Sequence, residues 1–154
     1  MNSAPVVFDC NVYAQALINP RGPAGECVEA AFDGKVLVCL SRFVVNEVRK
    51  LPGNPTMARF RMPLERADQL LAKLSPLAVF IEAPPVVFEH PIDPKDGPYI
   101  DLAVAAGAAV ITSRDKHLLN LTNPAKSWSA DFRARFPWLR VMSPEAFLRE
   151  LRYQ

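Results

Sequence analysis

The segment Val6-Val7-Phe8-Asp9 places an acid directly after three apolar residues. A short β-branched and aromatic run of this kind predicts a buried strand. Further apolar runs predict strands at residues 36–40, 77–81, 109–111 and 139–142, with 86–88 as a short extended piece. Because these strands are apolar throughout, they indicate a parallel sheet that is covered on both faces.

Segments with helical spacing lie between the predicted strands. They are residues 11–16, 26–32, the stretch after Ser41, 64–74, 99–106, 116–121 and the stretch after Ser143. Ser41 is a suitable N-cap, and Ser143 is followed by a proline in the first turn. Strands that alternate with helices predict an α/β fold. With no internal repeat and no linker, we expect one domain over residues 1–154.

Composition excludes several classes of protein. Half of the 154 residues are apolar and 22% are charged, which is ordinary for a globular chain and unlike disorder. No apolar run approaches the ~18 residues that cross a bilayer. Residues 1–5 carry no secretory signal, so we expect no membrane association and a cytoplasmic protein.

Cysteine and histidine usage limits the possible metal sites. Cys10, Cys27 and Cys39 are odd in number and form no Cys-x-x-Cys motif, so we expect buried, reduced thiols. The two histidines exclude a histidine-rich site. Basic stretches at residues 42–61 and from residue 114 onward suit a phosphate backbone, although an ordinary solvated surface explains them more simply.

Acidic residues follow the predicted strands in a consistent way. Asp9 ends the first strand, Asp115 comes just after the fourth, Glu47 lies in the helix after the second, and Asp96 starts the helix that leads to the fourth. The carboxyl ends of parallel strands share one edge of a sheet, so these acids can converge there. A divalent cation relieves the repulsion between them, and Mg²⁺ or Mn²⁺ prefers oxygen ligands. Such a site can support phosphodiester cleavage.

Each acid also has a simpler interpretation when taken alone. Asp9, Asp96 and Asp115 can each cap a helix, Asp93 competes with Asp96 for that role, and Glu47 can be a solvated helix residue. Only the combination indicates a site. Supporting hydrogen bonds can come from three polar residues, whose alternative is loop and cap chemistry: Asn11, Thr112 and Ser113.

Four motifs resemble those of PIN domains. They begin at Phe8-Asp9-Cys10-Asn11, at Ser41 with Glu47, at Asp93-Pro94-Lys95-Asp96 and at Ile111-Thr112-Ser113-Arg114-Asp115 with Lys116-His117-Leu118-Leu119. The Asp-Pro-x-Asp and Lys-x-Leu-Leu signatures resemble a branch of toxins from bacterial toxin–antitoxin pairs, the VapC-like ribonucleases.

This resemblance implies a three-layer α/β/α sandwich with a roughly five-stranded parallel sheet. It further implies an endoribonuclease dependent on Mg²⁺ or Mn²⁺, a homodimer, and inhibition by a cognate antitoxin protein. Carried over, Asp9, Glu47, Asp96 and Asp115 are the catalytic metal ligands, and Asn11, Thr112 and Ser113 support them. Arg42 and Arg114 are candidates for contacting the RNA substrate.

Two departures from the family pattern leave the site open to alternatives. The fourth motif has one extra residue before Asp115, which makes Ser113 a possible substitute contact. Gly97-Pro98 after Asp96 is unusual, so Asp93 or Asp101 could take the third position.

Two rival functions remain to be weighed. A haloacid-dehalogenase-like phosphatase also begins with a strand-end aspartate, but it needs a second aspartate where this chain has Asn11. The other rival is a catalytically degenerate PIN domain that binds RNA or protein.

Overall fold

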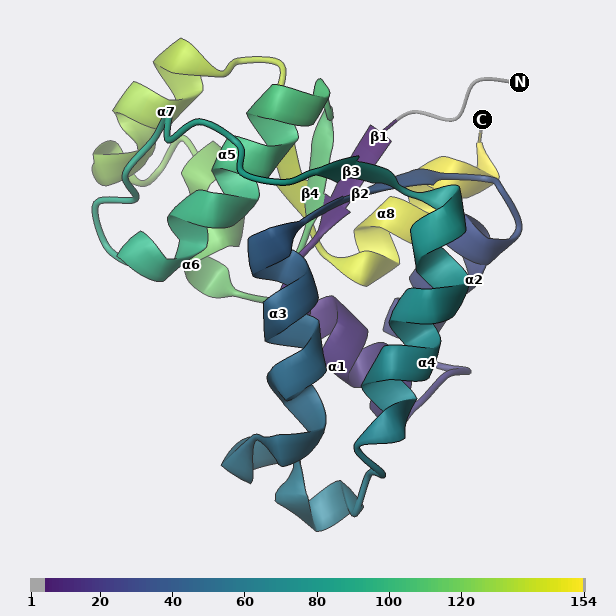
Figure 1. Ribbon diagram of the computed structural model, residues 1–154. Coiled ribbons are helices and arrows are strands. Elements are labelled where there is room, and N and C mark those ends of the chain that lie inside the picture. Colours follow the sequence, from purple (N-terminus) through teal and green to yellow (C-terminus); the bar gives the residue numbers. More distant parts are fainter. Residues whose placement is uncertain (1–4, 154) are drawn as a thin grey trace.

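The computed structural model describes residues 5–153; the segment in which we expected no secretory signal lies mostly outside this range. Five parallel strands form one sheet in the order β3-β2-β1-β4-β5 (Figure 1). The strands are β1 Pro5–Phe8, β2 Leu37–Ser41, β3 Val79–Ile81, β4 Val110–Thr112 and β5 Arg140–Met142. The predicted parallel α/β sheet is therefore confirmed.

Helices cover the sheet on both faces, as the apolar strands require. They are α1 Cys10–Ile18, α2 Pro23–Phe32, α3 Arg42–Lys50, α4 Glu65–Leu74, α5 Gly97–Ala106, α6 Lys116–Leu119, α7 Ala130–Arg135 and α8 Pro144–Arg152. On one face, Phe8 packs edge-on against Tyr13 of α1 and Phe147 of α8. Helix α5 packs against β1, β2, β3 and β4. The result is a three-layer α/β/α sandwich.

Short 3-10 helices connect several of these elements. They are η1 Leu51–Gly53, η2 Pro55–Phe60, η3 Ser75–Leu77, η4 Pro94–Asp96, η5 Asn120–Thr122 and η6 Ser127–Ser129. Figure 1 shows α3 and α4 extending away from the sheet, with η1 and η2 at their far end. None of the described helices is long and apolar enough to cross a membrane.

Local sequence explains several of the boundaries. Ser41 caps α3, because its Oγ accepts a hydrogen bond from the Val44 amide at 3.2 Å. Gly107 ends α5 in the left-handed conformation at φ 69°, which glycine adopts without steric cost. In the first turn of α2, a Cβ on Gly25 would lie 2.1 Å from the carbonyl oxygen of Pro20 in the preceding turn, so only glycine allows this close approach.

The structure differs from the expected secondary structure in two places. Residues 86–88 form no strand, because the amides of Val87 and Phe88 donate to the Asp101 carboxylate instead of to a neighbouring strand. Helix α7 was not predicted. The expected reduced thiols are present: Cys10, Cys27 and Cys39 are all free, and the last two are buried.

Candidate functional site

The candidate site lies where β1 and β4 end. These strands pair in register from Val6 with Val110 to Phe8 with Thr112. The Asp9 amide then donates to the Thr112 carbonyl at 2.9 Å. Asp9 and Ser113 consequently leave neighbouring strands side by side, at the carboxyl edge where open α/β sheets bind ligands.

The Asp9 side chain is buried and held by hydrogen bonds. Its Oδ2 accepts from Ser113 Oγ at 2.6 Å and from Asn11 Nδ2 at 3.2 Å. Asp9 occupies the N-cap position of α1, but its carboxylate makes no cap bond. The simpler interpretation of Asp9 as a helix cap is therefore wrong. Burial raises the pKa of Asp9, and the Ser113 hydrogen bond opposes that rise.

Ser113 connects two parts of the site. While its hydroxyl donates to Asp9, its Oγ accepts from the Asp115 amide at 2.9 Å. Asp115 in turn caps α6, because its Oδ1 accepts from the His117 amide at 2.7 Å. The extra residue of the fourth motif thus places a hydroxyl between Asp9 and the backbone of Asp115.

Three carboxylates meet beside this connection. One oxygen each of Asp93, Asp96 and Asp115 lies within 4.8 Å of the others. Asp96 and Asp115 were predicted, whereas Asp93 had been considered only as an alternative to Asp96. The two therefore occur together: Asp93 caps η4 by accepting from the Lys95 amide, and Asp96 makes no side-chain cap bond to α5.

Asp96 is the least satisfied of these groups. Only 5% of the residue is exposed, and its Oδ2 is buried with no hydrogen-bond partner. Burial, together with the charges of Asp115, Asp9 and Asp93, raises the pKa of Asp96 to about 7. Among the described residues, no lysine or arginine forms an ion pair with Asp9, Asp96 or Asp115.

These residues fit a hard divalent cation. Carboxylate oxygens are the ligands that Mg²⁺ and Mn²⁺ prefer, and a bound cation would satisfy the buried Asp96 oxygen. It would also remove the repulsion that raises the Asp96 pKa. The His117 ring lies beside this group, with Nδ1 3.7 Å from Asp93 Oδ2 and 4.0 Å from Asp115 Oδ1.

Glu47 lies on the same side of the molecule but outside the group of three carboxylates. Burial raises the pKa of Cys10 and of Tyr99, and the charges of Asp9 and Glu47 add to both increases. The Glu47 side chain is about one third exposed and lies 3.6 Å from Lys50. The predicted convergence of Glu47 with the other acids is therefore not seen among Asp93, Asp96 and Asp115.

Tyr99 is a site residue that the sequence reasoning missed. Its hydroxyl accepts a hydrogen bond from the Cys10 amide at 3.3 Å. Burial raises the pKa of Asp9, and Tyr99, after Ser113 and the Cys10 backbone, is among the groups that oppose this rise. Phe43 packs edge-on against the Tyr99 ring at 5.7 Å. The available signal was spacing, because Tyr99 follows Asp96 by three residues and so shares its face of the helix.

His90 was also missed, and it fixes the loop that carries Asp93. The buried ring accepts from the amides of Ile92 and Asp93 at Nδ1, both at 3.0 Å. Nε2 lies 2.9 Å from the His117 carbonyl oxygen and must therefore be the donating nitrogen. His90 thus ties the Asp93 loop to α6, which carries the Asp115 cap.

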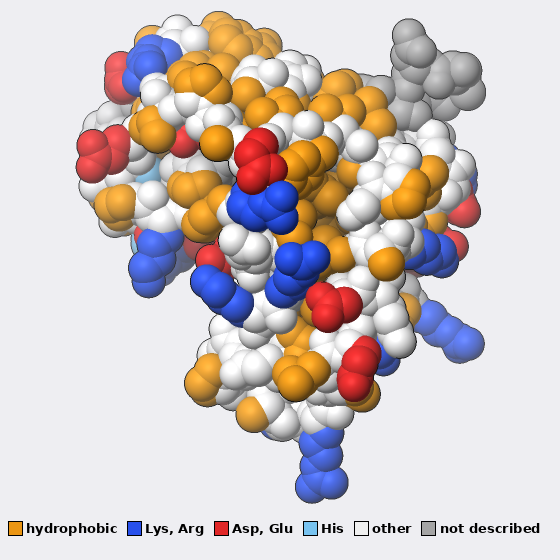
Figure 2. All heavy atoms as spheres, viewed as in Figure 1, with side chains coloured by type: hydrophobic (Ala, Val, Ile, Leu, Met, Phe, Trp, Pro, Cys, Tyr) orange, Lys and Arg blue, Asp and Glu red, His pale blue; other side chains and the backbone are white. Residues whose placement is uncertain are grey.

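The remaining predicted residues have varied surroundings. Thr112 is fully buried, and its hydroxyl has no partner among the described residues. Arg42 pairs with Glu82 through two 3.1 Å hydrogen bonds, and on the face shown in Figure 2 basic side chains lie among acidic ones. Arg114 pairs with Glu145 and hydrogen-bonds Gln15, so both arginines are already matched by carboxylates. Asp101 accepts hydrogen bonds from the backbone of residues 87 and 88 and lies outside the group formed by Asp93, Asp96 and Asp115.

The chain is similar to known proteins over most of its length. An uncharacterized protein of Methanocaldococcus jannaschii is 28% identical over 145 residues, which cover 94% of this chain and 90% of that protein. The profile of the PIN domain family matches residues 5–117, a range that contains Asp9, Glu47, Asp96 and Asp115. The chain therefore belongs to the PIN domain family.

Proposed function

We propose that this protein is a metal-dependent endoribonuclease that acts in the cytoplasm. PIN domains are generally nucleases that use divalent metal ions, so family membership supports a nuclease-type activity. The observation that carries the proposal is the meeting of Asp93, Asp96 and Asp115 beside Asp9, with one buried carboxylate oxygen left unpartnered. Such a cluster is unfavourable without a cation.

The residues of the site would have separate roles in metal binding and in positioning. Asp9, Asp96 and Asp115 would hold Mg²⁺ or Mn²⁺, with Asp93 close enough to join them and Glu47 positioned to approach from α3. Ser113 and Asn11 would fix the Asp9 carboxylate, and Tyr99 would hold the start of α1. When bound, the cation would supply charge stabilisation at the scissile phosphate and activate the attacking water.

Metal binding would also depend on the protonation state of Asp96. With its pKa near 7, this carboxylate is partly protonated in the metal-free protein at neutral pH. A cation needs the ionised form, so binding displaces that proton from Asp96.

RNA is the proposed substrate, and a toxin role is the proposed context. The resemblance to toxins depends on two signatures, Asp93-Pro94-Lys95-Asp96 and Lys116-His117-Leu118-Leu119. Their acids lie together, because Asp93 and Asp96 of the first are close to Asp115, which directly precedes the second. We accordingly propose a homodimer that a cognate antitoxin protein inhibits. Because Arg42 and Arg114 are paired with Glu82 and Glu145, they would contact RNA only by exchanging those partners for phosphate.

The alternative is a degenerate PIN domain that binds RNA or protein without cutting. The longer fourth motif was the reason to consider this possibility. In the structure, Ser113 uses that length to link Asp9 with Asp115, which favours a working site over a lost one.

The deciding experiment is cleavage of a mixed single-stranded RNA by the purified protein with Mn²⁺, with Mg²⁺ and with EDTA. Asp9→Ala should abolish cleavage and weaken metal binding measured by calorimetry. Asp33→Asn, which changes an exposed aspartate in the turn after α2, should behave like wild type. Undiminished cleavage by Asp9→Ala would refute the site; no cleavage and no metal binding by wild type would favour the degenerate alternative.

A further inference from the structure

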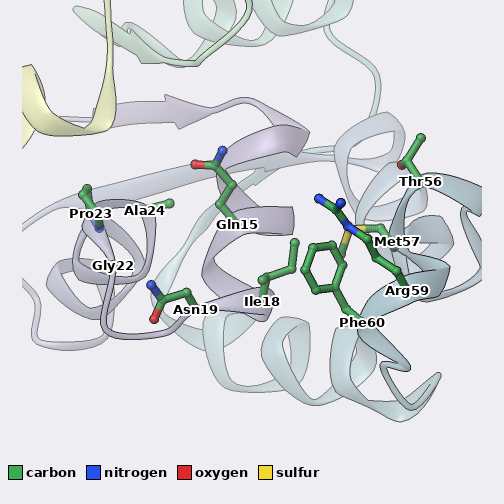
Figure 3. Close-up of a pocket in the computed structure, with 10 residues that line it drawn as sticks. All are labelled: Gln15, Ile18, Asn19, Gly22, Pro23, Ala24, Thr56, Met57, Arg59 and Phe60. Carbon is green, nitrogen blue, oxygen red and sulfur yellow. The ribbon is translucent and has the colours of Figure 1, made fainter.

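A cavity of about 430 Å³ lies beside α1, away from the carboxylates. Figure 3 shows Gly22 and Pro23 on one side of it, Arg59 and Phe60 of η2 on the other, and Gln15 and Ile18 of α1 between them. The volume falls within the range of small-ligand sites and can hold a nucleobase. No residue assigned to the carboxylate site lines this cavity.

The cavity lies along the same face of α1 as the site. Asn11, Gln15 and Ile18 follow helical spacing, so they line up along one side of the helix. Asn11 bonds Asp9, and Arg114 bridges Asn11 and Gln15 by donating its backbone amide to one and its side chain to the other. At ~1.5 Å per residue, Gln15 lies roughly 9 Å along the helix from Asp9. A few nucleotides, at ~3.4 Å per stacked base, bridge that distance.

The side chains around the cavity suit a base attached to a phosphate backbone. Arg59 lies over the Phe60 ring at 4.7 Å, and the Phe60 residue remains 39% exposed. Aromatic faces and arginine planes are what single-stranded nucleic acids stack on. Among the described lining residues Arg59 is the only charged one, so no carboxylate opposes a nearby phosphate.

The hydrogen-bonding groups of the cavity also suit a nucleic-acid base. Gln15 uses Oε1 to accept from Arg114, and Asn19 uses Oδ1 to accept from the Arg21 amide. The amide nitrogens of both side chains are left to donate, which suits the carbonyl oxygens of bases. A Cβ at Gly22 would come within 2.9 Å of Asn19 Nδ2, so the glycine keeps that amide unobstructed.

We infer that this cavity is a subsite for one RNA base a few nucleotides from the cleaved bond, with Phe60 and Arg59 as its stacking platform. The inference rests on the proposed ribonuclease function, because it is the Asp9 site that would fix the rest of the strand.

The chain contains a matched control for this platform. Arg42 lies over Phe80 at 5.4 Å, and Phe80 is 46% exposed on the edge strand β3. The two arginine–phenylalanine pairs share chemistry and exposure, but only the pair at Phe60 lines the cavity. Phe80→Ala therefore controls for the general loss of an exposed aromatic ring.

The test measures binding of a fluorescent 2′-O-methyl pyrimidine 10-mer, which resists cleavage, by polarisation in Mn²⁺ and in EDTA. Phe60→Ala should weaken binding about 5- to 100-fold, the range for losing one stacked base, and Phe80→Ala should change it less than 2-fold. Equal losses in both variants, or none in Phe60→Ala, would overturn the subsite. Thermal melting checks that both variants are folded.

Two further readouts separate this inference from the nuclease proposal. In RNA cleavage, Phe60→Ala should raise KM and leave kcat unchanged, because the ring is remote from the carboxylates. Cleavage by wild type with no effect of Phe60→Ala refutes the subsite alone, whereas Phe60-dependent binding without cleavage refutes the nuclease alone. A 5-iodouridine probe should cross-link within residues 48–65, identified by mass spectrometry after cleavage at Glu47 and Glu65; a cross-link at Phe80 would contradict the assignment.

Discussion

Asp96 at the N-cap of α5 and Asp101 in the second turn of that helix are both buried, but the two carboxylates have opposite surroundings. Asp101 accepts two backbone hydrogen bonds, from Val87 at 2.9 Å and Phe88 at 3.3 Å. Asp96 is equally buried but leaves an oxygen unpartnered and faces other carboxylates. A buried acid with donors holds a loop in place, whereas a buried acid without them is ready for a cation.

Removing the charge of Asp96 should give the largest effect. Asp96→Asn should lower RNA cleavage at least ~100-fold, more than the ~10–100-fold typical of residues that only support a metal ligand. Metal binding measured by calorimetry should fall in parallel. Asp101→Asn is the matched control. Its RNA cleavage and its metal binding per folded molecule should be unchanged, because the asparagine oxygen can still accept from the amides of Val87 and Phe88. Similar losses of cleavage and metal binding in Asp96→Asn and Asp101→Asn would show that the two aspartates do not differ in function.

The stability of the metal-free protein should depend on pH through Asp96. Its pKa of about 7 in the folded protein lies above the ordinary aspartate value of 3.8, so the folded state keeps a proton that the unfolded chain releases. Stability therefore falls as pH rises from about 4 to about 7 and is level above that, a change of roughly 2–4 kcal/mol. Urea unfolding across this range in EDTA measures it. If the free energy of unfolding of Asp96→Asn falls as much as that of wild type between about pH 4 and pH 7, the pH dependence does not come from Asp96.

Removing the carboxylate of Asp101 should affect stability instead of chemistry. In Asp101→Ala, the buried amides of Val87 and Phe88 lose their acceptor, which costs about 1–3 kcal/mol. The free energy of unfolding from urea titration should show this loss at every pH between 5 and 8. A metal affinity reduced in the folded protein would indicate that Asp101 contributes to the site after all.

Ser113→Ala should give the smallest effect on the site. The variant loses the donor to Asp9 and the acceptor for the Asp115 amide, so metal affinity should fall about 10-fold, the lower end of the range for such partners. Calorimetric titration with Mn²⁺ measures the change. Replacing the exposed Ser127 by alanine provides the control. An unchanged affinity in Ser113→Ala would mean that Asp9 is oriented by Asn11 and Tyr99 alone.

The strands and the edge at which the acids lie could be predicted from the sequence. Apolar runs located the strands, and the order of strands and helices placed Asp9, Asp96 and Asp115 at one edge, because parallel strands end together. The same reasoning could not choose between Asp93, Asp96 and Asp101. All three are acids near the start of one helix, and only the neighbouring segments distinguish them. Residues 86–88 illustrate the difficulty, since their apolar pattern suits a strand but their amides bond Asp101.

By itself, the sequence determined the parallel α/β sheet and the convergence of acids at its carboxyl edge. Hydrophobic periodicity is a local property of the chain, and strands that alternate with helices form parallel sheets whose strands end at one edge. Only the tertiary structure decided which acids face one another, which one binds the backbone, and that His90, Tyr99 and Ser113 hold them. Burial and hydrogen-bond partners come from segments up to about a hundred residues apart, such as Asp9 and Ser113, and no local pattern records them.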